Sequence, residues 1–327
     1  MTTTSLRPVL AASLLLTLAL AAAACGSSDA RGYDGADPTS MPAGTDPGAG
    51  GGGLGPRVDA GAGATGTGGC EKMDIVFVVD DSGSMGEEQA NLAANFPKFV
   101  SVLDQTRAGN GNPIDYRVAV TTTGRSYKLL GPFGIPDDVK GDDGAFRNNC
   151  GGPKRWLDKS EASQSFACRA QVGTGGPSEE MPLESMRLAL TDRVADGTNT
   201  GFVRDDALLA VVFLTDEDEC SFKGKTLTEG FGDLCESNGA EAPEAYVLTL
   251  DQIKGDRARW ATAVIAGKTQ CQSSFGSAAE AKRLGRFVTA TGKNAVFSSI
   301  CDGDLAKSLE EAIAKFGEAC KSFPGVR

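Results

Sequence analysis

Hydrophobic residues along the chain fall into short continuous runs that alternate with amphipathic stretches. Four of these runs are rich in β-branched or aromatic residues, which is typical of strands covered on both faces. They span residues 73–80, 116–121, 207–215 and 260–266, and a weaker run spans 295–300. We expect each run to form a strand, with the first and third as central strands.

The stretches between these runs carry apolar residues at helical spacing. Leu92, Phe96, Phe99 and Leu103 define a helix over residues 87–105, and further helices are expected at 183–194, 278–291 and 304–320. Alternating strands and helices produce crossover connections. The pattern therefore predicts an α/β fold, doubly wound, with a mainly parallel central sheet and helices on both faces.

The start of the chain has a different pattern. Arg7 precedes an apolar run over residues 9–20, and alanines lead to Cys25. This is typical of a signal peptide at 1–24, and the run is short for a membrane span. The segment resembles the bacterial lipobox, which implies lipidation of Cys25, with a lipid anchor as the only membrane contact. Gly26 in place of aspartate favours the outer membrane, on its periplasmic or cell-surface side.

Residues 26–69 hold 15 glycines among 44 residues and almost no large apolar side chains. We interpret residues 25–69 as a lipidated cysteine followed by a flexible tether. An unstructured segment without a function would have the same composition.

Eight cysteines remain beyond Cys25, an even number in a chain predicted to be exported. Connectivity does not follow from sequence, but spacing favours the pairs Cys150–Cys168, Cys220–Cys235, Cys271–Cys301 and Cys70–Cys320. Two of these pairs fall within segments too long for simple connections, about 125–179 and 220–245. We expect both segments to be disulfide-stapled insertions.

Charge and composition exclude several functions. The chain has no histidine, which removes His-dependent catalysis and His-ligated zinc, and its net charge of -11 disfavours nucleic acid. Gly267-Lys268-Thr269 and Gly224-Lys225-Thr226 imitate the end of a phosphate-binding loop. Thr262 and Glu219 stand where the first glycine is needed, so neither predicts a nucleotide site.

Polar residues gather where the two central strands end. Asp80-x-Ser82-x-Ser84 follows the first strand, and Asp216 follows the third. Ligands collect at the carboxyl ends of strands in open α/β sheets, and these oxygen donors suit Mg²⁺ best, with Mn²⁺ or Ca²⁺ as alternatives. Asp218 and Glu219 are interpreted as solvated loop acids.

The strand ending in Asp80-x-Ser82-x-Ser84-Met85, together with Phe213-Leu214-Thr215-Asp216, resembles the metal-ion-dependent adhesion site of von Willebrand factor type A domains. The resemblance covers residues 70–320 and leaves 321–327 as a C-terminal tail. It implies metal-mediated binding of a protein partner through a Glu or Asp side chain, and the lipobox adds that the binding protein is an exported lipoprotein. It implies no enzymatic activity.

The family places a threonine before its third helix, and this chain departs from that pattern. Glu180 occupies the corresponding position, and Ser178 and Thr174 are the other candidate ligands. A coordinating Glu180 would tighten metal binding and reduce the attraction for an external carboxylate.

Three alternatives stay open on the sequence. Ser84-x-x-Glu87 is a capping box, so Ser84 could serve only the helix that follows. The site could support metal-dependent phosphoryl hydrolysis, or it could be vestigial in a structural envelope domain.

Overall fold

The computed structural model describes residues 69–108, 110–131, 133–230, 233–273, 276–303 and 305–324. The segment 1–24, Cys25 and the tether up to residue 68 lie outside these described residues. The interpretations of signal peptide, lipidation and tether therefore stay predictions, as does the end of the tail beyond residue 324.

A six-stranded sheet forms the centre of the domain, in the order β11-β8-β6-β1-β2-β5. Its strands are β1 (Lys72–Val79), β2 (Asp115–Thr122), β5 (Leu157–Asp158), β6 (Ala207–Leu214), β8 (Trp260–Ala266) and β11 (Ala295–Ser299). All neighbours pair in parallel except β5, which is antiparallel to β2. The chain runs from β1 to β2 on one side and to β6 on the other, so the strand order reverses at β1.

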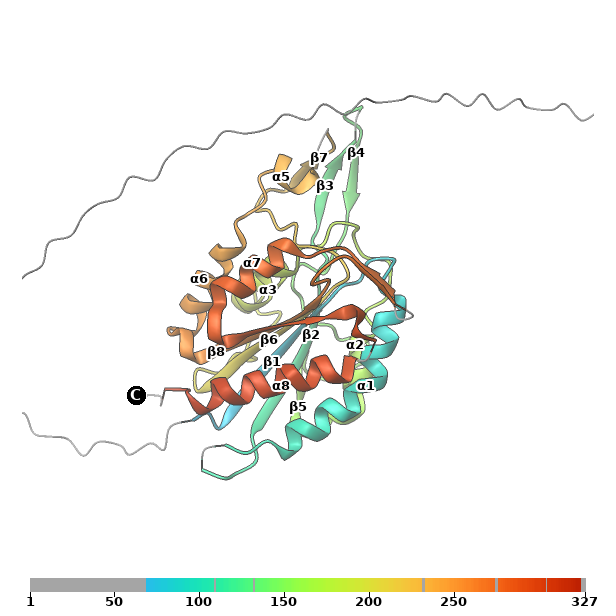
Figure 1. Ribbon diagram of the computed structural model, residues 1–327. Coiled ribbons are helices and arrows are strands. Elements are labelled where there is room, and N and C mark those ends of the chain that lie inside the picture. The colour runs from blue at the N-terminus through green and yellow to red at the C-terminus, as the bar shows by residue number, and fades with distance from the viewer. Residues whose placement is uncertain are drawn as a thin grey trace, which may run out of the picture. The chain divides into compact units, whose positions relative to one another are not determined.

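Helices cover both faces of this sheet (Figure 1). One face carries α1 (Gly86–Gln105), α2 (Lys159–Ala170) and α8 (Leu305–Lys321), and the other carries α3 (Pro182–Leu190), α6 (Pro243–Lys254) and α7 (Lys282–Thr291). Strand β1 alternates between the two cores: Phe77 packs with the first group of helices and Val78 with the second. The predicted α/β class, with a mainly parallel sheet between two helical layers, is confirmed.

Two helix boundaries differ from the prediction. The segment predicted as one helix over 183–194 breaks at Thr191 into α3 and the short α4 (Asp192–Ala195). Thr191 is the C-cap of α3, and its φ of -122° and ψ of -76° lie outside the helical region, so the helix ends there. The helix predicted over 278–291 begins only at Lys282, because residue 278 belongs to a hairpin of β9 (Cys271–Ser273) and β10 (Gly276–Ala278).

The two predicted insertions meet in a second sheet, of three strands in the order β4-β3-β7 (Figure 1). Segment 125–179 contributes β3 (Tyr127–Leu130) and β4 (Pro136–Val139), and segment 220–245 contributes β7 (Thr226–Thr228) and α5 (Leu234–Ser237). Its small core consists of Tyr127, Met181, Phe222 and Leu227. The sequence analysis did not predict this sheet.

Four disulfides join the pairs Cys70–Cys320, Cys150–Cys168, Cys220–Cys235 and Cys271–Cys301. These are the pairs that the spacing favoured. The first connects Cys70, two residues before β1, to the end of α8, where the N–H of Cys70 also donates to the carbonyl of Cys320 at 2.9 Å. Short 3-10 turns, η1 (Arg257–Arg259), η2 (Gly292–Asn294) and η3 (Ile300–Asp302), complete the described elements.

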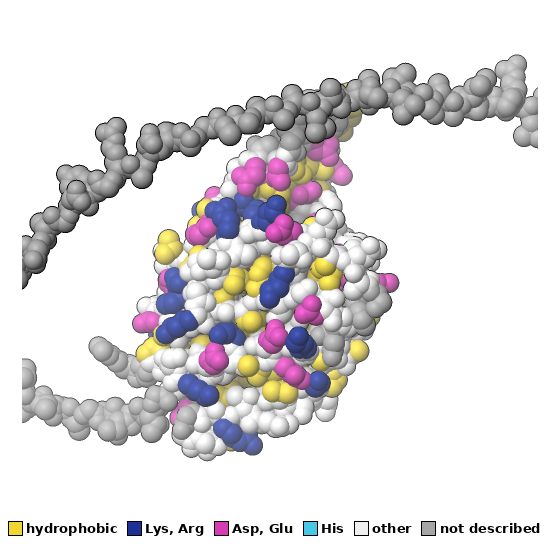
Figure 2. All heavy atoms as spheres, in the orientation of Figure 1, with side chains coloured by type: hydrophobic (Ala, Val, Ile, Leu, Met, Phe, Trp, Pro, Cys, Tyr) yellow, Lys and Arg dark blue, Asp and Glu magenta, His cyan; other side chains and the backbone are white. Residues whose placement is uncertain are grey.

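Basic and acidic side chains are interspersed over the face formed by α6, α7 and α8 (Figure 2). Ion pairs such as Arg286–Glu244 and Arg283–Glu236 account for part of this mixture. No helix in the described part of the chain has the length and hydrophobicity that a bilayer crossing requires.

The disulfide between the two ends of the domain should stabilise it more than the local ones do. Cys70–Cys320 closes a loop of 250 residues and Cys150–Cys168 one of 18. From loop-closure entropy we expect the Cys70→Ser/Cys320→Ser variant to lose roughly 5 kcal/mol of unfolding free energy and the Cys150→Ser/Cys168→Ser variant roughly 3 kcal/mol. Urea unfolding under non-reducing conditions measures both. Equal losses would contradict this prediction.

Candidate metal centre

Three neighbouring parallel strands end at one edge of the sheet, and a polar residue follows each of them. Asp80 follows β1, Thr215 follows β6 and Thr123 follows β2. Backbone hydrogen bonds extend the sheet through these positions, because the N–H of Asp80 donates to Leu214 and that of Thr123 donates to Val79. The strand-order reversal at β1 lies at this same edge, where open α/β sheets bind ligands.

Asp80 is fully buried at the centre of this edge. Its Oδ1 accepts the N–H of Ser82 at 2.7 Å, and its Oδ2 accepts the hydroxyl of Thr215 at 2.6 Å. The first bond folds the turn after β1, and the Ser82 and Ser84 hydroxyls lie 3.2 Å apart within that turn. Burial raises the pKa of Asp80, and the hydrogen bonds from Thr215 and Ser82 oppose that shift.

Glu180 reaches the same place from the segment before α3. The N–H of Met181 donates to the carbonyl of Thr123, and the N–H of Cys220 donates to that of Glu180, so both neighbouring segments hold it. Its side chain is 1% exposed, and neither carboxylate oxygen has a hydrogen-bond partner among the described residues. Burial and then the charge of Asp80 raise the pKa of Glu180 to about 10, and the nearby Thr123 hydroxyl lowers it.

Asp216 is the third carboxylate at this edge. Burial is the main cause that raises the pKa of Asp216, and the negative charge of Asp80 raises it further. The hydrogen bond from the Ser84 hydroxyl opposes this shift. The Oδ1 of Asp216 is also buried without a partner in the described part of the chain. Ser84, Glu180 and Asp216 line one cavity of about 390 Å³. The structure thus brings together five of the seven candidate ligands: Asp80, Ser82, Ser84, Glu180 and Asp216.

These residues fit a divalent cation. Buried oxygens without hydrogen-bond donors are costly in a protein interior, and a cation supplies the missing interaction. The donors are carboxylates and hydroxyls, the ligands that Mg²⁺, Mn²⁺ and Ca²⁺ prefer. Carboxylates around the centre repel one another in the absence of a cation. Burial and neighbouring charges raise the pKa values of Asp81 and Glu217 to about 7.

The two remaining candidates, Thr174 and Ser178, are both exposed. The Ser178 hydroxyl lies near the phenol of Tyr127, and Thr174 lies beside Gly86 at the start of α1, so its role as a ligand stays a prediction. The capping alternative does not form. Met85 is the N-cap of α1, and no side chain, including that of Ser84, bonds to the first turn as a cap.

Asp218 and Glu219 are not solvated loop acids, and this prediction was wrong. Asp218 accepts the N–H groups of Arg283 and Leu284 at the start of α7. Glu219 is 1% exposed and accepts the N–H groups of Leu183 and Ser221. Both acids hold neighbouring segments at the edge of the sheet.

Sequence reasoning missed two residues that shape the centre. Thr123 offers a buried hydroxyl without a partner among the described residues, and Thr215 holds Asp80. Each directly follows an observed strand, Thr123 after β2 and Thr215 after β6, and the hydrophobic run of each strand was predicted. The rule that selected Asp80 and Asp216 could therefore also have selected these two threonines.

No protein-family model matches the chain, and no curated protein sequence matches it. Solved structures of similar shape have low identity. Proximal thread matrix protein 1 from the mussel byssus is 13% identical, with 76% of this chain and 49% of that chain covered and a TM-score of 0.40. Manganese-loaded TRAP protein of Plasmodium vivax is 14% identical, with 74% of each chain covered and a TM-score of 0.37.

The pilus adhesin SpaC of Lactobacillus rhamnosus GG is 14% identical, with 78% of this chain and 32% of that chain covered and a TM-score of 0.37. The chain spans about half the length of the mussel protein. Because these identities and TM-scores are low, the description of the fold and of the candidate centre rests only on the geometry of this chain.

Glu219 should make the metal-free protein less stable as pH rises. Burial raises the pKa of Glu219 to about 7, from 4.5 in an exposed chain, while hydrogen bonds from Ser221 and Leu183 oppose the shift. The folded state therefore binds the proton more tightly, and that stabilisation is lost as pH rises through 7. We expect the stability advantage of wild type over Glu219→Gln to shrink by roughly 3 kcal/mol between pH 4.5 and pH 8.

Chemical denaturation of both proteins across this pH range, in metal-depleted buffer, measures the difference. The Gln variant also weakens one backbone hydrogen bond, but that loss does not depend on pH. A difference that stays constant with pH would contradict the assignment.

Proposed function

We propose that residues 70–320 form a von Willebrand factor type A domain that binds a divalent cation, and through it a protein partner. One observation carries the proposal. Five residues from three separate segments, namely Asp80, Ser82, Ser84, Glu180 and Asp216, converge at the strand-order reversal, and buried oxygens of Glu180 and Asp216 have no partner among the described residues.

The cation is proposed to be Mg²⁺, with Mn²⁺ and Ca²⁺ as the other candidates. Asp80, Glu180 and Asp216 would supply carboxylate oxygens, and Ser82 and Ser84 would supply hydroxyls. The bound ion would attract an oxygen of the partner. Ser84 is exposed and lines the cavity of about 390 Å³, which provides an approach from solvent.

The partner is proposed to offer a Glu or Asp side chain to the ion. Glu180 works against this preference, because it brings a third carboxylate to a centre whose family pattern has a threonine. A partner carboxylate would also meet Glu217 and Glu179 in the wall of the cavity. We therefore expect the partner carboxylate to bind the ion more weakly than it would at a centre made of Asp80, Ser82, Ser84 and Asp216 without Glu180.

The protein is proposed to be exported and held at the outer membrane by a lipid on Cys25. Four disulfides support an oxidising compartment, since such bonds persist outside the reducing cytosol. In this proposal the domain binds and does not catalyse.

Metal binding should depend on the hydroxyl of Ser84. We expect isothermal titration of wild type with Mg²⁺, Mn²⁺ and Ca²⁺ to give a single site, and Ser84→Ala to weaken it at least tenfold because one oxygen donor is lost. Ser84 is exposed, so the substitution leaves the core intact. Asp80→Ala should abolish binding.

Glu87→Gln is the matched control, because Glu87 is an exposed acid in the first turn of α1 close to the site. It should bind the metal like wild type. Wild type that binds none of the three cations would refute the metal centre, and equal affinity in wild type and Ser84→Ala would remove Ser84 from it.

Capture of the partner should require the bound cation. It should increase when Glu180 is replaced by threonine, the residue that the family pattern has at this position. With envelope extract passed over immobilised protein, we expect the same bound species in Mg²⁺ to be lost in EDTA and in Asp80→Ala. Glu180→Thr should retain more of that species at equal loading, because one negative charge is removed. Capture that is identical with and without Mg²⁺ would refute metal-mediated binding and favour a vestigial site.

A further inference from the structure

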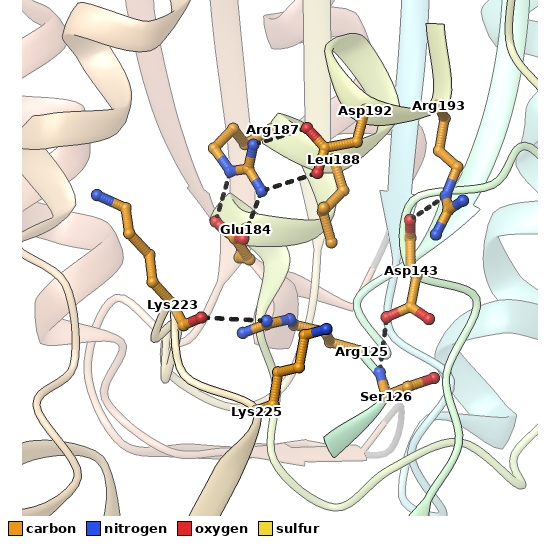
Figure 3. A pocket seen from close by; sticks show the side chains of 10 residues that line it. All are labelled: Arg125, Ser126, Asp143, Glu184, Arg187, Leu188, Asp192, Arg193, Lys223 and Lys225. Atoms are coloured by element: carbon orange, nitrogen blue, oxygen red, sulfur yellow. Dashed lines mark hydrogen bonds and ion pairs between the residues drawn. The ribbon is translucent and has the colours of Figure 1, made fainter. Parts of the chain in front are cut away.

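A second cavity, of about 680 Å³, lies between the small sheet and helices α3 and α4 (Figure 3). Both insertions contribute to its wall: Arg125, Ser126 and Asp143 come from the first, and Lys223 and Lys225 come from the second. None of the candidate metal ligands lines it. The volume is typical of sites that bind small molecules.

Cationic side chains outnumber carboxylates in the lining of this cavity, although the whole chain has a net charge of -11. Its lining carries five cationic side chains and three carboxylates. The cationic ones are Arg125, Arg187, Arg193, Lys223 and Lys225, and the acidic ones are Asp143, Glu184 and Asp192. Lys223 pairs with Glu241 and Arg193 with Asp196, both outside the lining, so Arg125 and Lys225 are the lining cations that form no ion pair among the described residues.

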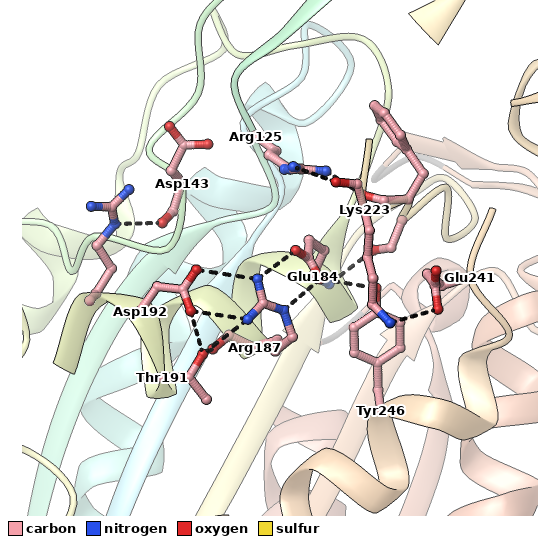
Figure 4. A network of polar contacts seen from close by, with 12 residues as sticks. Arg125, Asp143, Glu184, Arg187, Thr191, Asp192, Lys223, Glu241 and Tyr246 are labelled. Carbon is pink, nitrogen blue, oxygen red and sulfur yellow. Dashed lines mark hydrogen bonds and ion pairs between the residues drawn. The ribbon is translucent and has the colours of Figure 1, made fainter. Parts of the chain in front are cut away.

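Two of the three carboxylates are already engaged with one arginine (Figure 4). Arg187 donates to Glu184 at 2.9 and 2.8 Å and to Asp192 at 3.1 Å. Glu184 also accepts the hydroxyl of Tyr246 at 3.1 Å. Arg187 offsets only one of these two negative charges, so the cluster keeps one negative charge. The third carboxylate of the lining, Asp143, accepts the N–H of Ser126 at 2.8 Å.

Arg125 is the unusual member of the lining. Its side chain is buried, and its guanidinium donates to the backbone carbonyls of Phe222 and Lys223 and lies 5.1 Å from the ring centroid of Phe222. No carboxylate within the described residues forms an ion pair with it. Carbonyls satisfy hydrogen bonds but leave the positive charge without a counter-charge, which is costly for a buried group.

Lys225 adds a second uncompensated cation. Figure 3 draws it on the same side of the cavity as Arg125, facing the Glu184–Arg187 pair. Its ammonium group has no ion-pair partner among the described residues, whereas Lys223 pairs with Glu241 at 3.1 Å. The carbonyl of Lys225 accepts the N–H of Lys128 at 2.8 Å, so the pairing of β7 with β3 fixes the position of its backbone.

We propose that this cavity binds a small multivalent anion, a phosphate or a polycarboxylate, between Arg125 and Lys225. The N–H groups of the guanidinium that the carbonyls of Phe222 and Lys223 do not use can donate to the oxygens of such an anion, and the flexible ammonium adds a point charge. The anion replaces the missing counter-charge of Arg125. This site is independent of the proposed metal centre and does not rest on it.

The test is calorimetric titration of the whole protein with inorganic phosphate and, separately, with citrate. Both titrations are run in metal-depleted buffer at an ionic strength held constant with NaCl. We expect at least one probe to bind wild type, and Lys225→Gln to weaken that binding at least tenfold. Lys225 is exposed, so its substitution does not disturb the core.

Lys128→Gln is the matched control, because Lys128 is an exposed lysine on β3 that pairs with Asp138 and does not line the cavity. It should bind the probe like wild type, and so should Asp80→Ala, whose change affects only the metal centre. Failure of both probes to bind wild type would overturn the proposal. Equal affinity in wild type and Lys225→Gln, or an equal loss in Lys128→Gln, would also overturn it.

Discussion

The pairing of β1 with a parallel strand on each side is the constraint on which the rest of the structure depends. Val79 lies opposite Thr122 on β2 and opposite Leu214 on β6, so these three strands end at the same level at the edge of the sheet. All residues of β1 from Met73 onward are buried. After Asp74, which pairs with Arg204, the side chains of β1 from Ile75 to Val79 are all apolar. Polar groups follow where the strand ends, and there Asp80 meets Thr215 and the segment that carries Glu180.

The central fold was predictable because its signal is strong and local. Continuous apolar runs identified β1, β2, β6 and β8, and the alternation with helices gave the parallel sheet. The small sheet was not predictable by the same reasoning. β4 consists of Pro-Asp-Asp-Val and β7 has three residues, so neither carries a hydrophobic pattern. Their pairing with β3 depends on contacts between segments far apart in the sequence.

The candidate site divides in a similar way. Asp80, Ser82, Ser84 and Asp216 follow strands, so their convergence follows from the sheet. Glu219 was misread because five consecutive polar residues, 215–219, look solvated in sequence. In the structure Glu219 is buried and accepts hydrogen bonds from the N–H groups of Leu183 and Ser221. The local sequence pattern around Glu219 does not predict the position of these donors.

The disulfide between Cys70 and Cys320 gives the domain a mechanical axis. It lies at the amino end of β1, and the candidate metal centre lies at the carboxyl end of the same eight-residue strand, about 26 Å away. A force applied between Cys70 and a group held at Asp80 would act along β1. The hydrogen bonds from β1 to β2 and β6 would then bear it together in shear, and the disulfide would pass part of it to α8.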